Sequence, residues 1–191
     1  MKPWNIHPGL TVERLQTVGN VIRSARHSAV TSYEPEKGDD PWSLGCVAYA
    51  RTRSAISKAT EKYEWLKVVE AGLHFVFSVG GVPLRFYHGD SESPPDRSLR
   101  RNFPEIKAQQ LALEFIKVPL TSGIFRIAVE TDERGEATSL TLVLVDAVGE
   151  PQDSWPIPAT AEILPLYEPK PSVDVGPPTV RVRRDDAASE E

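Results

Sequence analysis

Apolar and polar residues alternate on both sides of a Gly-Gly pair at residues 80–81, within the stretch LHFVFSVGGVPLRFYHGD. Alternation of this kind predicts strands, and a Gly-Gly pair supplies the positive φ angles that a two-residue turn requires. We therefore predict a β-hairpin over residues 73–90. Three pairs then share one face, which we assign to the core: Val79 with Val82, Phe77 with Leu84, and Phe75 with Phe86.

A second alternating pattern surrounds the turn sequence Asp-Glu-Arg-Gly at residues 132–135. Residues 124–130 and 137–145 each place apolar side chains at every second position, so they predict a second hairpin. A short strand near Trp155 could continue this hairpin as a meander. The prolines that follow it would confine that strand to the edge of the sheet, because proline donates no ladder hydrogen bond.

Two other segments have apolar residues at three- and four-residue intervals, which predicts helices. The first covers residues 12–27, with Thr11 placed to cap its N-terminus. The second covers residues 104–117 and begins at Pro104, followed by an apolar side that includes Ile106.

A further helix is predicted between these two segments. Asp40 and Pro41 form a strong start, because aspartate is a good N-cap and proline fits the first helical position. Apolar residues continue as far as Ala71, followed by Gly72 as a plausible terminator. The pattern leaves open whether residues 41–71 form one helix or two helices broken near residues 57–60.

These elements predict an α+β domain over residues 1–164, in which N-terminal helices and one central helix pack on an antiparallel sheet built from the two hairpins. The expected order is α-α-β-β-α-β-β. Residues 165–191 are rich in proline, valine and charge. Such a segment buries too little apolar surface to offset its ordering entropy, so we predict a disordered C-terminal tail.

Composition narrows the functional classes. The 191 residues contain one cysteine, Cys46, and four histidines, without the spacing of a zinc site. The serine-hydrolase GxSxG, metalloprotease HExxH and P-loop motifs are absent, and we expect no cofactor. We find no apolar run long enough to span a membrane and no secretory signal pattern, so we expect a cytoplasmic protein.

Charge divides the chain. Residues 1–110 contain 15 basic and 12 acidic residues, whereas residues 111–191 contain 7 basic and 15 acidic residues. The excess of basic over acidic residues in the N-terminal part is smaller than in most nucleic-acid-binding domains. An acidic C-terminal half would be repelled by nucleic acid.

The outer face of the first predicted hairpin carries the most chemically suggestive group. In the predicted register His74 faces Tyr87, Arg85 lies on the same side, and the strand leaves through His88 and Asp90. A guanidinium, a phenol and an imidazole can all donate hydrogen bonds to an anion. One hypothesis is therefore a sensor of a small anionic ligand, although solvated cross-strand pairs are the ordinary explanation of such a face.

Basic residues in the next segment suggest a second hypothesis, nucleic-acid binding. Phosphates would be bound by Arg85 and by basic residues of the following segment, and Tyr87 would stack on a base. The further basic candidates are Arg97, Arg100, Arg101 and Lys107. A metal-dependent nuclease using Asp90, Glu105 and Lys107 is a weaker alternative.

Our leading hypothesis is a non-catalytic, protein-binding or regulatory accessory subunit. It is motivated by the missing catalytic motifs, the divided charge and a tail that could fold on a partner. Aromatic residues dominate many protein interfaces, although core packing explains them equally well here. The candidate interface residues are Trp42, Tyr49, Tyr63 and Trp65. The sequence does not determine the oligomeric state.

Overall fold

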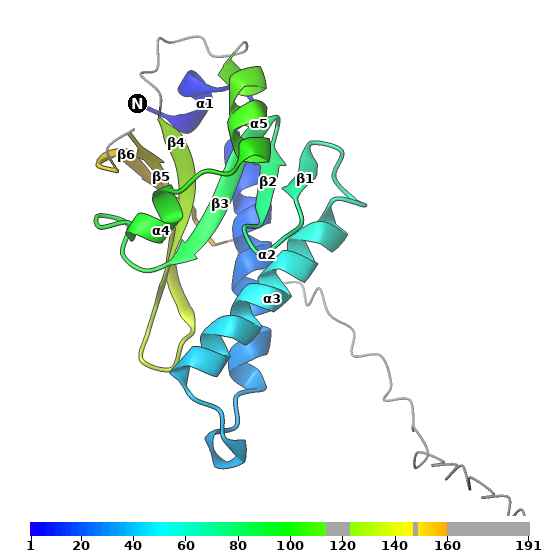
Figure 1. Ribbon diagram of the computed structural model, residues 1–191, viewed down its shortest axis with the longest axis vertical. Helices are drawn as coiled ribbons and strands as arrows, with labels where there is room; N and C mark the ends of the chain where they lie inside the picture. Colours follow the sequence, from blue (N-terminus) through cyan, green and yellow to red (C-terminus); the bar gives the residue numbers. More distant parts are fainter. Residues whose placement is uncertain (114–122, 147–148, 160–191) are drawn as a thin grey trace, which may run out of the picture.

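The computed structural model describes residues 1–113, 123–146 and 149–159 as helices around a mixed β-sheet (Figure 1). The elements in chain order are α1 (Pro3–Ile6), α2 (Val12–Thr31), the 3₁₀ turn η1 (Pro35–Lys37), α3 (Pro41–Ala59), β1 (Leu66–Glu70), β2 (Val76–Val79), β3 (Val82–His88), α4 (Asp96–Leu99), α5 (Phe103–Leu113), β4 (Ile124–Thr131), β5 (Ala137–Val145) and β6 (Pro151–Pro156).

The six strands lie in the sheet in the order in which they occur in the chain. All neighbouring pairs are antiparallel except β3 and β4, which run parallel. A parallel pair needs a crossover connection, because the chain must return to the end at which the first strand began. The segment that contains α4 and α5 makes this crossover.

The main core lies between the sheet and the long helices α2 and α3. Val18 and Ile22 of α2 and Ile56 of α3 are buried against alternate residues of the strands, such as Phe77 and Ile127. Figure 1 shows α2 behind the strands and crossed by α3, while α4 and α5 lie in front of the sheet. The helices therefore cover both faces of the sheet, and the crossover connection supplies the second layer.

Local sequence accounts for the start of each long helix. The Thr11 side chain accepts a hydrogen bond from Arg14 N in α2. Asp40 and Ser43 form a reciprocal capping box at α3, with Pro41 at the first helical position. These contacts satisfy backbone donors that have no intrahelical partner.

The predicted α+β class, both hairpins and the edge strand at Trp155 are confirmed. The predicted pairs of Val79 with Val82 and of Phe77 with Leu84 are present. The sheet is mixed rather than purely antiparallel, because the crossover makes β3 and β4 parallel. Residues 114–117 of the predicted central helix and the predicted tail at residues 165–191 lie outside the described residues.

The predicted continuation of the second helix to Gly72 is wrong. Helix α3 ends at Ala59, and Leu66–Glu70 forms strand β1, which pairs with β2. β-branched residues at positions 68 and 69 fit a strand well, and pairing with β2 satisfies their backbone groups.

Among the helices of the described residues, none combines the length and the apolar character that a membrane span requires.

Candidate protein interface around helix α5

A buried ion pair joins α5 to the middle of the sheet. Arg126 on β4 is 0% exposed and Glu105 in the first turn of α5 is 1% exposed. Arg126 Nη1 donates to Glu105 Oε1 over 2.6 Å, and Arg126 Nε donates to the Ser98 carbonyl over 2.6 Å. One guanidinium therefore holds both α4 and α5 against the sheet.

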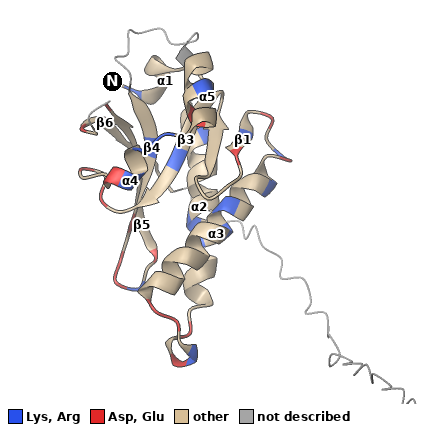
Figure 2. Ribbon diagram, viewed as in Figure 1, with Lys and Arg blue, Asp and Glu red and all other residues tan. Residues whose placement is uncertain are grey.

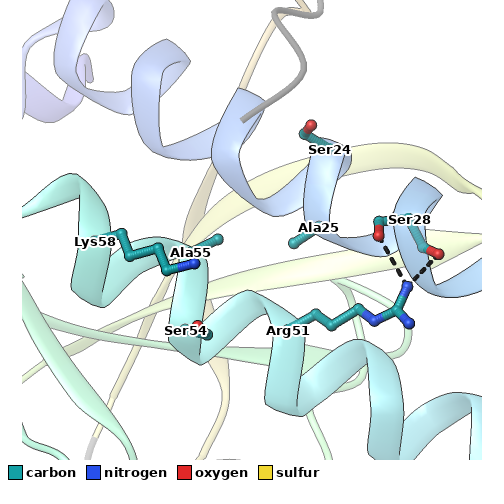
Figure 3. Close-up of a pocket in the computed structure, with 7 residues that line it drawn as sticks. All are labelled: Ser24, Ala25, Ser28, Arg51, Ser54, Ala55 and Lys58. Carbon is teal, nitrogen blue, oxygen red and sulfur yellow. Dashed lines mark hydrogen bonds between the residues drawn. The ribbon is translucent and has the colours of Figure 1, made fainter. Parts of the chain in front are cut away.

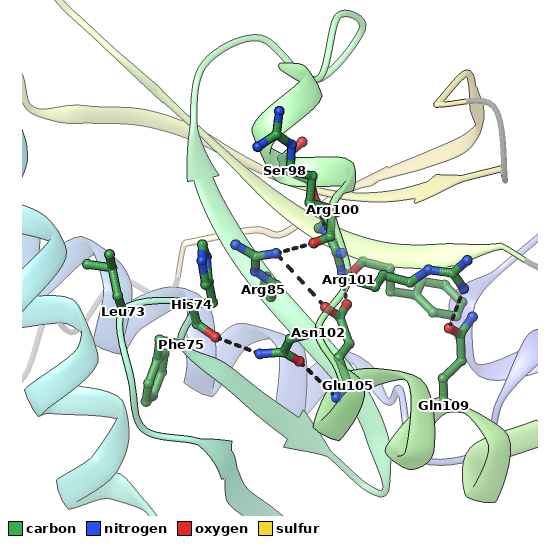
Figure 4. Close-up of polar contacts among 12 residues, drawn as sticks. Leu73, His74, Phe75, Arg85, Ser98, Arg100, Arg101, Asn102, Glu105 and Gln109 are labelled. Carbon is green, nitrogen blue, oxygen red and sulfur yellow. Dashed lines mark hydrogen bonds and ion pairs between the residues drawn. The ribbon is translucent and has the colours of Figure 1, made fainter.

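Arg85 extends this arrangement from the neighbouring strand. It is the register partner of Arg126 in the parallel β3–β4 pair. Arg85 Nη1 donates to the Arg100 carbonyl over 2.5 Å and lies 4.0 Å from Glu105 Oε2 (Figure 4). Two adjacent arginines thus attach the crossover segment to the sheet and share a single carboxylate.

The cluster has an excess of positive charge. Burial lowers the pKa of Arg126 to about 10, while Glu105 opposes this shift and Arg85 and Arg101 add to it. The guanidinium therefore remains protonated at neutral pH. Within the described part of the chain, Arg126 Nη2 and Glu105 Oε2 have no hydrogen-bond partner. Removing Glu105 would leave the Arg126 charge buried without its carboxylate, and removing Arg126 would leave Glu105 with only Arg85, 4.0 Å away.

The outer side of α5 carries apolar side chains that no described residue covers. Phe103 is 78% exposed and Ile106, one turn later, is 37% exposed. Leu73, in the connection between β1 and β2, is also 78% exposed. Asn102 Nδ2 donates to the His74 carbonyl over 3.4 Å, so this connection lies beside the start of α5 (Figure 4). Leu73 and Phe103 are the chain neighbours of the two residues that make this contact.

Basic residues border these apolar side chains. Arg100, Arg101 and Lys107 are exposed, and Arg101 Nη1 donates to Gln109 Oε1 over 3.0 Å. Figure 2 shows basic positions on both β3 and α5. We call this surface the α5 face. It is defined as the exposed residues of α5 and of the two connections that meet at its start: Leu73, Arg100, Arg101, Phe103, Ile106 and Lys107.

The four predicted interface aromatics have different environments. Trp42 on α3 is 76% exposed, whereas the others are half-buried and pack against the main core. The Tyr49 hydroxyl donates to the Leu73 carbonyl over 2.7 Å, so Tyr49 positions part of the α5 face. Tyr63 and Trp65 contact each other with ring centroids 5.1 Å apart. Only Trp42 among the four presents most of its side chain to solvent.

The polar group predicted on the first hairpin does not form one open site. The β2–β3 pairing extends only to Phe77 and Leu84, so His74 lies outside the strand and does not face Tyr87. His74 belongs to the connection between β1 and β2. Beyond Leu84, strand β3 pairs with β4 and no longer with β2. His74 is exposed, and its carbonyl rather than its ring is held by Asn102.

Tyr87 shares the face of Arg85 but is buried in the smaller core on the second side of the sheet, with Ala128 and Val143. Its hydroxyl donates to the Asp90 carbonyl over 2.9 Å. Burial, with smaller contributions from the Asp90 and Glu130 carboxylates, raises the pKa of Tyr87 to about 12. The phenol is therefore neutral and its ring is unable to stack on an external base.

His88 lies at the far end of β3, with Nε2 3.0 Å from Thr131 Oγ1. Its pKa is lowered, first because the ring is desolvated and then because the Arg26 and Arg97 guanidiniums repel a proton. Arg97 itself is exposed on α4. These residues are near one another but belong to the end of the sheet rather than to the α5 face.

The acidic residues considered for a metal have other partners. Asp90 Oδ1 accepts a hydrogen bond from Glu92 N over 2.8 Å, and Glu105 faces the two buried arginines. Across residues 1–113, 123–146 and 149–159 there is no group of three or more His, Cys, Asp or Glu placed to hold a metal ion. The nuclease hypothesis therefore gains no support from this geometry.

A groove of about 250 Å³ lies between α2 and α3 (Figure 3). Arg51 Nη1 donates to both the carbonyl and the hydroxyl of Ser28 across it, the latter over 2.8 Å. Lys58, Ser24 and Ser54 also line the groove. The Arg51–Ser28 hydrogen bonds join the two helices across the groove. This structural role explains why the groove is lined by polar side chains.

Sequence reasoning missed the Arg126–Glu105 pair and the exposure of Phe103. A signal for the pair was present, because Arg126 is the one charged residue among apolar ones from Ile124 to Val129. A charge at a position that faces a covering helix requires a buried partner of opposite sign. Phe103 lies directly before the predicted helix start at Pro104, and no pattern marked it out.

A scan of protein-family models and searches of curated proteins and of solved structures find nothing that matches this chain. We therefore infer function from the α5 face itself.

Proposed function

We propose that the chain is a cytoplasmic, non-catalytic protein-binding or regulatory accessory subunit. Its α5 face would bind an acidic segment of a partner protein that also carries apolar side chains. The observation that supports this proposal is the exposure of Phe103 and Leu73, 78% each, beside Arg100, Arg101 and Lys107.

The orientation of α5 favours an interface over an ordinary solvated surface. A surface helix usually buries its apolar side and exposes its charges. Helix α5 instead buries Glu105 and exposes Phe103 and Ile106. Covering a large apolar side chain contributes about 1.5–3 kcal/mol. A partner that covers Phe103 and Leu73 would therefore gain several kcal/mol before the costs of association.

The charge of the face defines the chemistry of the partner. Three basic side chains border the apolar residues, and the exposed residues of the face include no carboxylate. Arginine and phenylalanine are both enriched in protein interfaces. An acidic partner would be attracted over long range and oriented on binding, and the attraction would weaken with salt.

The face is also held in place before binding. The Arg126–Glu105 pair fixes α5, and Tyr49 holds the Leu73 carbonyl. A preorganised surface loses less conformational entropy when a partner binds.

Nucleic-acid binding has weaker support. Tyr87, the predicted stacking residue, is buried, and Arg85 donates to the Arg100 carbonyl instead of facing solvent. Arg97, Arg100 and Lys107 remain exposed. The exposed Leu73 and Ile106 contribute little to binding a phosphate backbone, whereas they suit a protein surface, and Phe103 is the one exposed aromatic of the face that a base could stack on.

The proposal can be tested by site-specific photocrosslinking in native cells. A photoreactive phenylalanine analogue would replace Phe103 in one sample and Trp42 in a control sample, because Trp42 has the same degree of exposure on another helix. We expect a discrete protein adduct from position 103, resistant to nuclease and absent from position 42. The partner identified by mass spectrometry would then be purified and its affinity measured.

For the purified pair, Phe103→Ser should weaken binding at least about tenfold, equivalent to about 1.4 kcal/mol. Trp42→Ser should leave the affinity unchanged, and Lys107→Glu should weaken binding and reduce its salt dependence. Equal adducts from both positions would contradict the proposal, as would wild-type affinity in both Phe103→Ser and Lys107→Glu. An adduct removed by nuclease would transfer support to nucleic-acid binding.

A further inference from the structure

A separate cavity of about 500 Å³ lies between the α1–α2 connection, the β2–β3 turn and the inner side of α5. Ligand pockets in proteins usually have volumes of about 300–1,000 Å³. Its lining residues differ from those of the α5 face, although Leu111, which lines it, is 56% exposed on the same helix. The side chains on which its chemistry depends are Pro8, Arg14, Ser78, Ala108, Leu111 and Ala112.

Two glycines build one wall of the cavity at very close range. An added Cβ on Gly9 would lie 2.4 Å from the Gly80 carbonyl oxygen, and one on Gly80 would lie 2.5 Å from Gly9 Cα. Arg14 Nη1 donates to the Gly9 carbonyl over 3.1 Å and ties the same crossing to α2. Gly80 also has φ +57°, as the hairpin turn requires. The wall is therefore fixed by backbone contacts before any ligand binds.

The polar groups of the cavity are suited to an anion. Arg14 provides a cation at its edge, and its Cζ lies 5.6 Å from the centroid of the Trp65 ring. Ser78 is 6% exposed and lines the cavity, where its hydroxyl adds a hydrogen-bond donor. No carboxylate is among the described residues that line the cavity. The available side-chain charge is therefore positive.

His7 supports this assignment from the same wall. Its Nδ1 accepts a hydrogen bond from Gly9 N over 2.9 Å, so the ring proton is on Nε2. Nε2 is buried beside α5 without a hydrogen bond of ordinary geometry. Burial lowers the pKa of His7, opposed by the Ala112 carbonyl. His7 is therefore neutral at pH 7 and adds a donor rather than an acceptor to this wall.

The remaining lining is apolar. Ala108, Leu111 and Ala112 form one side along α5, and Pro8 faces them from the α1–α2 connection. The small alanine side chains leave space that larger side chains would fill. A ligand that fits must therefore combine a single anionic end with a compact hydrocarbon body.

We propose that this cavity binds a small organic monocarboxylate, with its carboxylate on Arg14 and Ser78 and its hydrocarbon body against Ala108, Leu111 and Ala112. Two hydrogen bonds from a guanidinium suit the planar carboxylate group, and the alanines accept the hydrocarbon without a hydrogen-bond requirement.

The experiment uses the full chain with hexanoate, benzoate and phenylacetate as probes. Isothermal titration calorimetry would measure affinity, and Trp65 fluorescence would report binding next to Arg14. We expect saturable millimolar or tighter binding of at least one carboxylate. The matched alcohol and amine should bind at least about tenfold more weakly. The fluorescence change should disappear in Trp65→Phe while the calorimetric binding remains.

Two variants act on different parts of the cavity. Arg14→Gln removes the cation, and Ala108→Phe fills the apolar side, so each should weaken binding at least about tenfold. Arg51→Gln is the matched control, because Arg51 also donates from a helix to a backbone carbonyl but lies in the α2–α3 groove. The Arg51→Gln variant should bind the carboxylate with the same affinity as the wild type.

Circular dichroism would confirm that each variant is folded before its affinity is interpreted. The proposal is overturned if none of the three carboxylates binds saturably. It is also overturned if the alcohols bind as tightly as the acids, or if folded Arg14→Gln and Ala108→Phe both retain wild-type affinity. None of these outcomes depends on whether the α5 face binds a protein.

Discussion

The buried Arg126–Glu105 pair can be tested with a double-mutant cycle of Arg126→Met and Glu105→Leu. Each single substitution removes one charge and leaves the other buried, since Arg126 is 0% and Glu105 1% exposed. Breaking a buried pair in this way costs about 3–5 kcal/mol. We therefore expect each single variant to lose about that much of its free energy of unfolding.

The double variant should be much less destabilised than the sum of the two losses, because neither charge remains. Replacing a buried pair by apolar residues is often close to neutral. Here the Ser98 carbonyl also loses the Arg126 Nε–H, which donates over 2.6 Å. An unsatisfied buried acceptor costs about 1–3 kcal/mol, so we expect a net loss of that size in the double variant.

Urea unfolding at pH 7, followed by circular dichroism, would measure all three variants. Glu34→Gln is a suitable control, because the Lys37–Glu34 pair is equally short, 2.5 Å, but its side chains are 75% and 52% exposed. An exposed pair of this kind contributes about 1 kcal/mol or less. Additive losses in the cycle, or a Glu105→Leu loss no larger than that of the control, would refute the reasoning.

Two further predictions concern other parts of the fold. Gly9→Ala should destabilise the protein by about 1–3 kcal/mol, because the added Cβ would meet the Gly80 carbonyl. Gly45→Ala has open space around the added Cβ and should stabilise the protein by up to about 1 kcal/mol. Equal thermal denaturation midpoints for the two variants would contradict this prediction. Burial lowers the pKa values of His7 and His88, so their contribution to stability is complete above about pH 6.5 and is lost as the pH falls through the lowered values. The free energy of unfolding should therefore decline between about pH 6.5 and pH 5, and a variant with glutamine at both positions should show a shallower decline; an unchanged slope would exclude this origin.

The sequence predicted those parts of the fold that depend on short-range pattern. Gly80 and Gly81 defined the turn of the first hairpin, and alternation assigned Phe77 and Leu84 to the core. Strand β1 was missed because residues 66–70 follow a helix without a Gly or Pro break. Its strand conformation depends on pairing with β2, which is a tertiary contact.

The candidate site was less predictable. Arg100, Arg101 and Lys107 were identified as an exposed basic group, and they are exposed. The grouping of His74 with Tyr87 failed because the β2–β3 pairing ends before it reaches them. The parallel pairing of β3 and β4, which places Arg85 beside Arg126, depends on the path of the crossover, and no local pattern encodes that path.

The parallel β3–β4 pair links the fold to the proposed interface. Parallel pairing requires a crossover, and in this chain the crossover contains α5. The sheet attaches to the first turn of that helix through the buried ion pair of Arg126 with Glu105. The apolar side chains Phe103 and Ile106 are consequently left on the outer side, where the fold itself gives them no function. An ion pair inside and hydrocarbon outside is unfavourable for a helix that faces only water, and a protein partner over the α5 face would remove that cost.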